Sequence, residues 1–353
     1  MRVLGFGLAI SLALAAAACE PKTEAVQGAS SQASSGATSK AALDPCAGMF
    51  HAVCTDKDLA ALGSQMKSSL ANAAAAVSPQ GLKVLAQNEQ GWLEAKRVQC
   101  GIPAGATSLS LSQATCLKSA WTSRLQSALS AVEKKGPFTF QRVEINQTDK
   151  VAPTPAVKLM GAEAPTTLSH SITFPRIDGD APAIQKFNES VRQAPRFKSS
   201  DQTEETTTYQ FGYVGPDLVS VKFDLKDLTI GGAHQNASMS AMSFNMATGA
   251  PVAVADLFNT NSKWQDFLAA RAARDVTTQL RGEDSTARAV DPSMVRDAVA
   301  QPRAWFITDS ALVLIIPAAA LAPAATEAHL VTIPWRQLRG YLNPRGPGPI
   351  KGA

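Results

Sequence analysis

Four cysteines constrain the fold of this chain more than any other feature. Cys46, Cys54, Cys100 and Cys116 enclose a stretch whose apolar residues recur at helical spacing, and paired cysteines indicate an oxidising compartment. We expect the four thiols to meet at one end of a helical hairpin. The sequence leaves their pairing open among three connectivities. Bridges between distant partners, such as Cys54 with Cys116, would each stabilise the fold by about 4 kcal/mol.

The first nineteen residues indicate export and lipidation. Arg2 precedes an apolar run, and three alanines precede the fifth cysteine, Cys19. The run is shorter than the roughly 20 apolar residues of a membrane span and is typical of a secretory leader. We therefore expect residues 1–18 to be a lipoprotein signal peptide and Cys19 to carry a lipid anchor. The alternative is ordinary cleavage near Cys19, which would leave a free thiol.

The segment after the leader predicts a tether. Residues 19–43 are rich in Ser, Ala, Gly and Gln and contain few large apolar residues, so they cannot bury enough surface to fold. Glu20 after the lipidated cysteine resembles lipoproteins passed on to the outer membrane, and we expect the body to face the periplasm. The leaflet and the oligomeric state stay open. The net charge of +4 is small and basic tracts are missing from the sequence, which argues against nucleic acid as a partner.

The composition changes near Gly136 and predicts a multi-domain chain. Before it, the apolar spacing predicts a small all-α domain over residues 44–135, stapled by the disulfides, with a break at Ser78-Pro79 and a third helix opening at Cys116. Thr55 or Asp56 is expected to cap the first helix. After Gly136, period-two alternation predicts an α+β domain with a mainly antiparallel sheet over residues 136–345. We expect residues 346–353 to be a disordered tail.

The helical part carries the motifs W-L-x6-C and C-L-x6-R, with Trp92, Leu93 and Arg124 at their fixed positions. Over about residues 45–129 this pattern resembles the LprI-like family of bacterial lysozyme inhibitors. The resemblance implies a disulfide-stapled helical hairpin that binds lysozyme. The chain departs from the family pattern where Ala60, Gly63 and Glu89 replace the usual Asn, Tyr and Gln, and where Lys96-Arg97 replaces an Arg-Asp pair. Trp92 is expected to be a core residue, with a direct contact to the partner as the alternative.

The second part carries further motifs in a fixed order. They are an F-P-x-I-x-G strand end at residues 174–179, Asn188 in the next helix, G-G-A-H and D-L-F. Over about residues 167–342 they resemble the ectodomain of RsiV anti-sigma factors and the N-terminal part of some peptidoglycan deacetylases. In RsiV-type proteins that ectodomain binds lysozyme, which is the property the resemblance implies here. The residues of the last two motifs are Gly231, Gly232, Ala233 and His234, then Asp256, Leu257 and Phe258.

The sequence indicates a binding protein rather than an enzyme. His234 invites a catalytic or metal-binding interpretation, but the other histidines lack ligand spacing and the common hydrolase motifs are missing from the sequence. We expect neither cofactor nor metal, with Gly231 and Gly232 shaping a turn across which His234 forms a hydrogen bond.

Our first hypothesis is a periplasm-facing lipoprotein that binds and inhibits lysozyme or a related muramidase. The loop of residues 101–113 is its candidate contact, since a rigid loop can fill a glycosidase cleft. The alternative is a non-catalytic envelope module that binds peptidoglycan or a partner envelope protein. A hydrolytic enzyme ranks last.

Overall fold

The computed structural model describes residues 43–46, 50–161, 164–193, 202–232, 235–321 and 328–352. The leader, Cys19 and the tether predicted over residues 19–43 lie outside this part of the chain, apart from Leu43, which is buried against the helices. Within the described residues, no helix is both long and apolar enough to cross a membrane.

Three helices form the first part of the fold, after a 3-10 turn at His51–Val53: α1 (Lys57–Ala75), α2 (Pro79–Gln99) and α3 (Leu111–Ala128). Asp56 caps α1, because its carboxylate accepts hydrogen bonds from the N–H groups of Asp58 and Leu59. The predicted break at Ser78-Pro79 is confirmed, with Ser78 as the cap of α2 and Pro79 as its first residue. The third helix begins at Leu111 rather than Cys116, because a capping box at Ser110 starts it earlier.

The disulfides join neighbours in sequence, Cys46 to Cys54 and Cys100 to Cys116. All four cysteines border one hydrophobic cluster, so the expected convergence of the thiols is confirmed. The bridges close sequence separations of 8 and 16 residues. In the chain-entropy model such loops stabilise by about 2.5 and about 3 kcal/mol, less than bridges between distant partners would.

Gly63 has a packing role at a position where the pattern that the sequence resembles has Tyr. A Cβ atom at this position would lie 2.6 Å from Sγ of Cys46 and 3.3 Å from the Trp121 ring. The first disulfide therefore packs directly on the α1 backbone, and a Tyr side chain at residue 63 would displace it.

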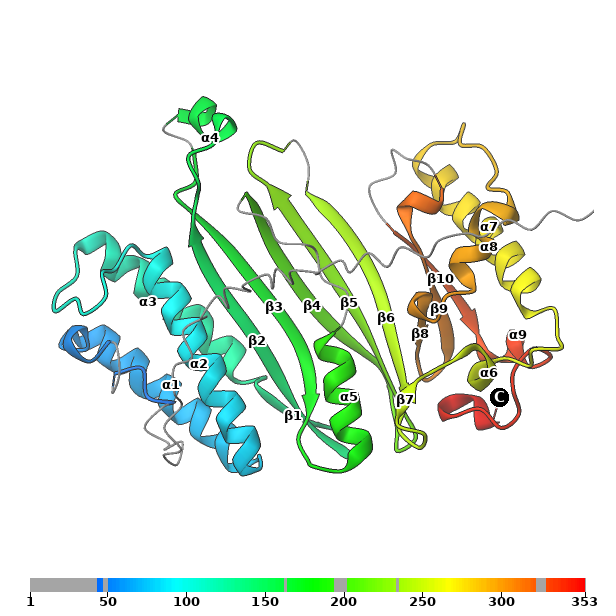
Figure 1. The fold of residues 1–353 in the computed structure, drawn as a ribbon, viewed down its shortest axis with the longest axis horizontal. Coiled ribbons are helices and arrows are strands. Elements are labelled where there is room, and N and C mark those ends of the chain that lie inside the picture. The colour runs from blue at the N-terminus through cyan, green and yellow to red at the C-terminus, as the bar shows by residue number, and fades with distance from the viewer. Residues whose placement is uncertain are drawn as a thin grey trace, which may run out of the picture. The chain divides into compact units, whose positions relative to one another are not determined.

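Seven strands follow in a sheet whose spatial order equals the chain order (Figure 1). All neighbours are antiparallel except β3 and β4, which are parallel over three residue pairs. Along the chain, α4 (Pro155–Met160) connects β2 to β3, and α5 (Pro182–Arg192) follows β3 and precedes β4. The predicted fold class, a disulfide-stapled helical part followed by a mainly antiparallel α+β part, is confirmed. The strands are β1 (Val132–Lys135), β2 (Phe138–Lys150), β3 (Thr167–Ile177), β4 (Thr203–Val214), β5 (Leu218–Thr229), β6 (Asn236–Asn245) and β7 (Ala250–Pro251).

The compositional change at Gly136 falls inside a β-hairpin. Gly136 joins β1 to β2 with a φ of +55°, a conformation that favours glycine. A Cβ atom there would also lie 2.7 Å from the Val214 carbonyl oxygen. The first strand of the sheet thus belongs to the residues that we assigned to the helical part.

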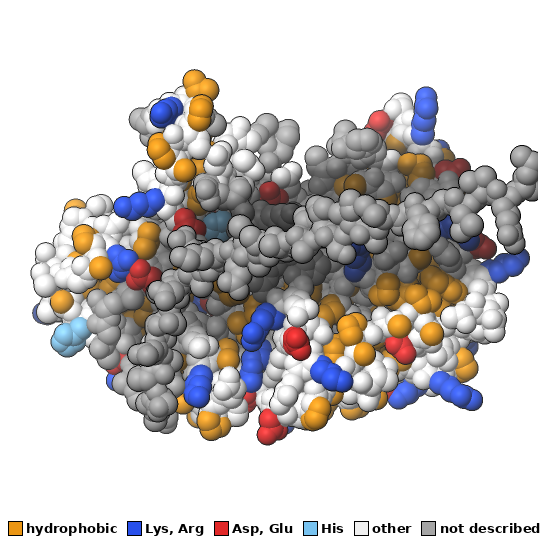
Figure 2. All heavy atoms as spheres, viewed as in Figure 1, with side chains coloured by type: hydrophobic (Ala, Val, Ile, Leu, Met, Phe, Trp, Pro, Cys, Tyr) orange, Lys and Arg blue, Asp and Glu red, His pale blue; other side chains and the backbone are white. Residues whose placement is uncertain are grey.

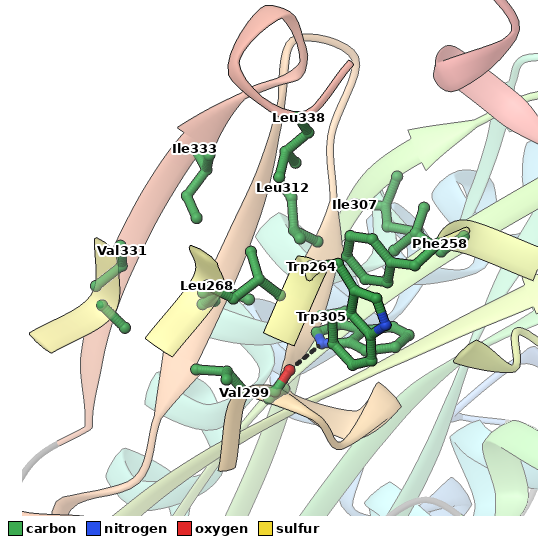
Figure 3. Packing of buried hydrophobic residues seen from close by; sticks show 14 of the residues in the cluster. Phe258, Trp264, Leu268, Val299, Trp305, Ile307, Leu312, Val331, Ile333 and Leu338 are labelled. Atoms are coloured by element: carbon green, nitrogen blue, oxygen red, sulfur yellow. Dashed lines mark hydrogen bonds between the residues drawn. The ribbon is translucent and has the colours of Figure 1, made fainter. Parts of the chain in front are cut away.

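A second, three-stranded sheet and four helices complete the fold. The core between them contains an aromatic cluster: Phe258 lies parallel to Trp264 at 4.5 Å, and both rings are nearly perpendicular to Trp305 (Figure 3). The Trp305 indole N–H donates to the Val299 carbonyl at 2.8 Å. The elements are α6 (Val254–Leu257), α7 (Trp264–Glu283), α8 (Pro292–Val299), β8 (Trp305–Ile307), β9 (Ala311–Ile316), β10 (His329–Pro334), α9 (Trp335–Leu338) and 3-10 turns at Pro302–Ala304, Ala318–Ala320 and Gly348–Gly352.

The C-terminal tail differs from the disordered segment expected over residues 346–353. Its described residues form the last 3-10 turn, and Ile350 is buried in the core of the second sheet. The Gly348 N–H donates to Asp217, and the Lys351 ammonium pairs with the same carboxylate. One buried apolar side chain, Ile350, and one half-buried carboxylate, Asp217, hold this short segment. Composition does not reveal these contacts.

The turn after β3 fixes the start of α2. The Asp178 carboxylate accepts from the Ser78 backbone N–H at 2.6 Å and from the Ser78 hydroxyl at 2.7 Å, and it pairs with Arg176 at 3.0 Å. Asn188 of α5 holds the same turn, since its carboxamide accepts from the Ile177 N–H and donates to the Ile177 carbonyl. The F-P-x-I-x-G motif and Asn188 therefore have structural roles.

Replacing Asp178 by Asn should destabilise the fold by about 1–3 kcal/mol, because an amide cannot accept both hydrogen bonds from Ser78. Burial alone would raise the pKa of Asp178, but the Ser78 hydrogen bonds and Arg176 hold it below 3.8. The stabilisation is therefore present above the unfolded pKa and is lost as the pH falls through the lower, folded pKa. Urea unfolding at neutral and acidic pH measures both effects. Asp180→Asn, an exposed change two residues away, is the control; equal losses for the two variants would contradict the assignment.

Candidate functional site

A pocket of about 560 Å³ lies where α2 and α3 meet strands β1 to β4. We call it the helix–sheet pocket. Its floor comes from β2 and β3, one wall from α2 and α3, and another from β4. The pocket therefore depends on the packing of the helices against the sheet.

The floor is a row of polar side chains. Thr148 pairs in register with Ser169, Asn146 with Ser171 and Glu144 with Thr173, so these alternate residues share one face of the sheet. The Ser171 hydroxyl donates to the Asn146 side chain at 3.3 Å, and the Thr173 hydroxyl donates to the Thr207 carbonyl at 3.0 Å. Among the described residues, the hydroxyls of Thr148 and Ser169 have no hydrogen-bond partner. The floor thus offers both satisfied and open hydroxyl groups.

The helical wall brings together two of the motif residues found in the sequence. The Arg124 guanidinium of α3 lies 5.1 Å from the centre of the Trp92 ring of α2, within the range of a cation–π contact. Trp92 is 6% exposed and belongs to the hydrophobic cluster beneath the disulfides, so its predicted role in the core agrees with its burial. Leu93 packs in the same cluster and does not line the pocket.

Arg124 belongs to a largely buried cluster of four charges, three of which also line the pocket. Arg124 pairs with Glu89 of α2 and, at 2.5 Å, with Glu144 of β2, and Arg142 pairs with Glu144 at 2.6 Å. The side chains of Arg124, Glu89 and Glu144 are at most 7% exposed. The cluster therefore joins two helices to the sheet through contacts that water does not screen.

The two acids of this cluster titrate differently. Burial raises the pKa of Glu89, and the charge of Arg124 only partly offsets it. Burial alone would also raise the pKa of Glu144, but Arg124 and Arg142 outweigh it and hold that pKa below 4.5. Glu89 is the acid of the helical part that pairs with Arg124.

Aromatic residues of β4 form the opposite wall. The rings of Tyr209 and Phe211 meet edge to face at 5.4 Å. Burial raises the pKa of Tyr209 far above its usual range, and the charge of Glu133 adds to this, so the phenol keeps its proton. His170, at the pocket rim, has Nε2 3.6 Å from Asp149, while its buried Nδ1 has no hydrogen-bond partner among the described residues.

The pocket can bind a polar molecule through many hydrogen bonds. Within the described residues, no group of three or more His, Cys, Asp or Glu side chains is arranged to hold a metal ion. Over the face drawn in Figure 2, basic and acidic side chains of the described residues are interspersed.

The disulfide Cys100–Cys116 closes a second surface feature, the loop of residues 101–110. The Arg97 guanidinium donates to the Ile102 carbonyl at 2.6 Å, and the Gln113 side chain donates to the Gly101 carbonyl at 2.7 Å. Gly101 adopts a φ of +63°, which favours glycine at the turn out of α2. Beyond the loop Leu111 is 86% exposed. The loop is thus fixed at its base and open to solvent.

The G-G-A-H and D-L-F motifs do not join this site. Gly231 has a φ of +75° in the turn after β5, as the expected backbone role requires, but Ala233 and His234 lie outside the described residues. Asp256 accepts from the Ala253 N–H at 2.8 Å at the start of α6, and Leu257 and Phe258 are buried. The D-L-F motif therefore starts a helix and fills the core.

Our sequence analysis missed the sheet side of the pocket. The signal was present in the alternation of Arg142, Glu144, Asn146 and Thr148 along one strand. This alternation predicts a polar face on the strand, but it does not predict that helices cover part of that face.

Comparisons with known proteins give structural neighbours only. No family model and no curated protein matches the chain. The chain is similar to the crystal structure of a DUF3298 family member from Bacteroides fragilis, at 12% identity and a TM-score of 0.40, over 62% of this chain and 98% of that one. It is also similar to a DUF3298 family protein from Pseudomonas aeruginosa, at 14% identity and a TM-score of 0.42, over 60% of this chain and 98% of that one.

Replacing Arg124 by Met should lower the free energy of unfolding by about 3–5 kcal/mol, because Glu89 and Glu144 would stay buried without their shared cation. The matched control is Lys118→Met on the same helix. Lys118 pairs with Asp56 and Asp58 at the surface, where water screens the charges, so its loss should cost far less than the loss of Arg124. Denaturant titration compares the two variants, and similar losses would show that the buried cluster has no special role.

Proposed function

We propose that this chain is a lipid-anchored protein of the cell envelope that binds lysozyme or a related muramidase and blocks its cleft. The observation that carries the proposal is the 101–110 loop, which is exposed and held at its base by the Cys100–Cys116 disulfide. A loop of fixed shape loses little conformational entropy when it binds, which is how rigid loops achieve affinity for enzyme clefts.

The charge and size of the loop suit this task. Residues 101–113 contain small and hydroxyl-bearing side chains and no charged residue, so the segment can enter a narrow cleft without burying an unpaired charge. Leu111 at its end is an exposed apolar side chain and a candidate anchor for the complex.

The compartment is part of the proposal. Two disulfides close within the helical part, as is typical of proteins outside the cytosol. The leader and Cys19 support anchoring by lipid, which would place the loop at the wall that lysozyme attacks.

Purified chain should bind lysozyme and slow its lysis of cell walls. Leu111→Asn should weaken binding by at least about tenfold if Leu111 anchors the complex. The control is Leu129→Asn, at the other end of α3, where the side chain is also exposed, at 71%. Biolayer interferometry against hen-type, goose-type and invertebrate-type lysozymes measures affinity, and a turbidity assay measures inhibition.

Two outcomes would contradict this proposal. The first is the absence of binding and inhibition for all three lysozyme types at micromolar concentration. The second is an equal effect of Leu111→Asn and Leu129→Asn, which would move the contact away from the loop.

A further inference from the structure

We propose that the helix–sheet pocket is a second binding site, for an uncharged saccharide chain. The pocket lies on the sheet side of α2, whereas the 101–110 loop lies at its C-terminal end, so this site does not depend on lysozyme binding. Its ligand class follows from three features of the lining: its charges, its hydroxyl groups and the position of its floor.

The two arginines of the pocket are already paired. The lining also holds one lysine, Lys96, whose ammonium donates to the Gln99 side chain, and one further acid, Glu133. Arg142 donates to Glu144, to the Ser130 hydroxyl and to the Ser127 carbonyl, so all of its nitrogens are engaged. Arg124 is engaged in the same way by Glu89 and Glu144. Neither guanidinium is left to form the bidentate contact by which arginine binds phosphate or carboxylate. The pocket therefore holds no guanidinium that is free to bind an anion, and the charge of Lys96 in its lining is matched by that of Glu133.

Hydroxyls and a phenol are among the groups of the lining that stay open. Thr148 and Ser169 face each other on the floor with no hydrogen-bond partner among the described residues, and the Tyr209 hydroxyl is likewise without one in that part of the chain. A hydroxyl both donates and accepts, as each hydroxyl of a sugar does. Tyr209 and Phe211 add apolar area against which a sugar ring can pack.

The position of the floor argues against a peptide ligand that binds by adding a strand to the sheet. Strand addition needs the free edge of a sheet, and the pocket lies on a sheet face. On the nearest edge, that of β2 beyond its pairing with β1, Asn88 of α2 occupies the first open groups: its carboxamide donates to the Arg142 carbonyl at 2.7 Å and accepts from the Glu144 N–H at 3.1 Å. A ligand on the face of the sheet meets side chains, which favours a polyhydroxylated molecule over a peptide backbone.

Two variants test the site. Thr148→Val removes one open hydroxyl from the floor and keeps its shape, so binding should weaken about fivefold, the effect of one lost hydrogen bond. Ser171→Phe places a ring in the middle of the floor and should abolish binding. Thr206→Val is the matched control, since Thr206 is an exposed strand residue of β4 that does not line the pocket.

The probes are the β-1,4-linked tetramers of glucose and of N-acetylglucosamine, titrated into the purified full chain by calorimetry, and isolated peptidoglycan sacculi, with which the chain is co-sedimented. Tetramer binding that is weakened by Thr148→Val and unchanged by Thr206→Val would support the site. If the chain co-sediments with sacculi and Ser171→Phe abolishes this co-sedimentation, the cell wall is the source of the saccharide. If the chain binds a tetramer but does not co-sediment with sacculi, the ligand is a free saccharide.

The proposal is overturned if neither tetramer nor sacculi bind, or if Thr148→Val and Thr206→Val have the same affinity. Circular dichroism checks that Ser171→Phe folds, and the near-isosteric Thr148→Val keeps the test decisive if it does not. Because Leu111→Asn should leave saccharide binding unchanged, this site and the lysozyme contact can fail separately.

Discussion

Arg124 is the residue on which the arrangement of helices and sheet depends. It lies between Glu89 of α2 and Glu144 of β2, with almost no access to water. Removing such charges from water costs several kcal/mol per ion, and the cost is offset only when every member is present in good geometry. The cluster therefore favours one packing of the helices on the sheet, and the pocket exists only in that packing.

α2 also covers part of the edge of β2. β1 pairs with β2 only as far as Gln141, which leaves the next carbonyl and N–H groups of β2 open to another chain. Asn88 satisfies both of them with one side chain, and the Ser78–Asp178 contact fixes the start of the same helix. An edge that could promote aggregation is thus used to dock the helical part.

The sequence predicted the elements whose signal is local. Helical spacing, the Ser78-Pro79 break and strand alternation predicted α1, α2 and the sheet, because each pattern reports on one segment at a time. Contacts between segments were not predictable in this way. The pairing of the four cysteines, the β1–β2 hairpin inside the assigned helical part and the role of Glu89 all depend on how distant residues meet. Trp92 and Arg124 were found through their motif, but their mutual contact needed the fold.

The two surfaces proposed for binding share α2 as their support. Its start is held by Asp178, its middle by Asn88 and Glu89, and its end by the Cys100–Cys116 disulfide at the base of the loop. A ligand at one surface could change affinity at the other only if α2 had a second arrangement that one ligand favours. Moving α2 would break the buried ion pairs and reopen the edge of β2 at the same time. Since packed cores do not deform gradually, this cost keeps α2 in one position, and the loop and the pocket should therefore bind independently.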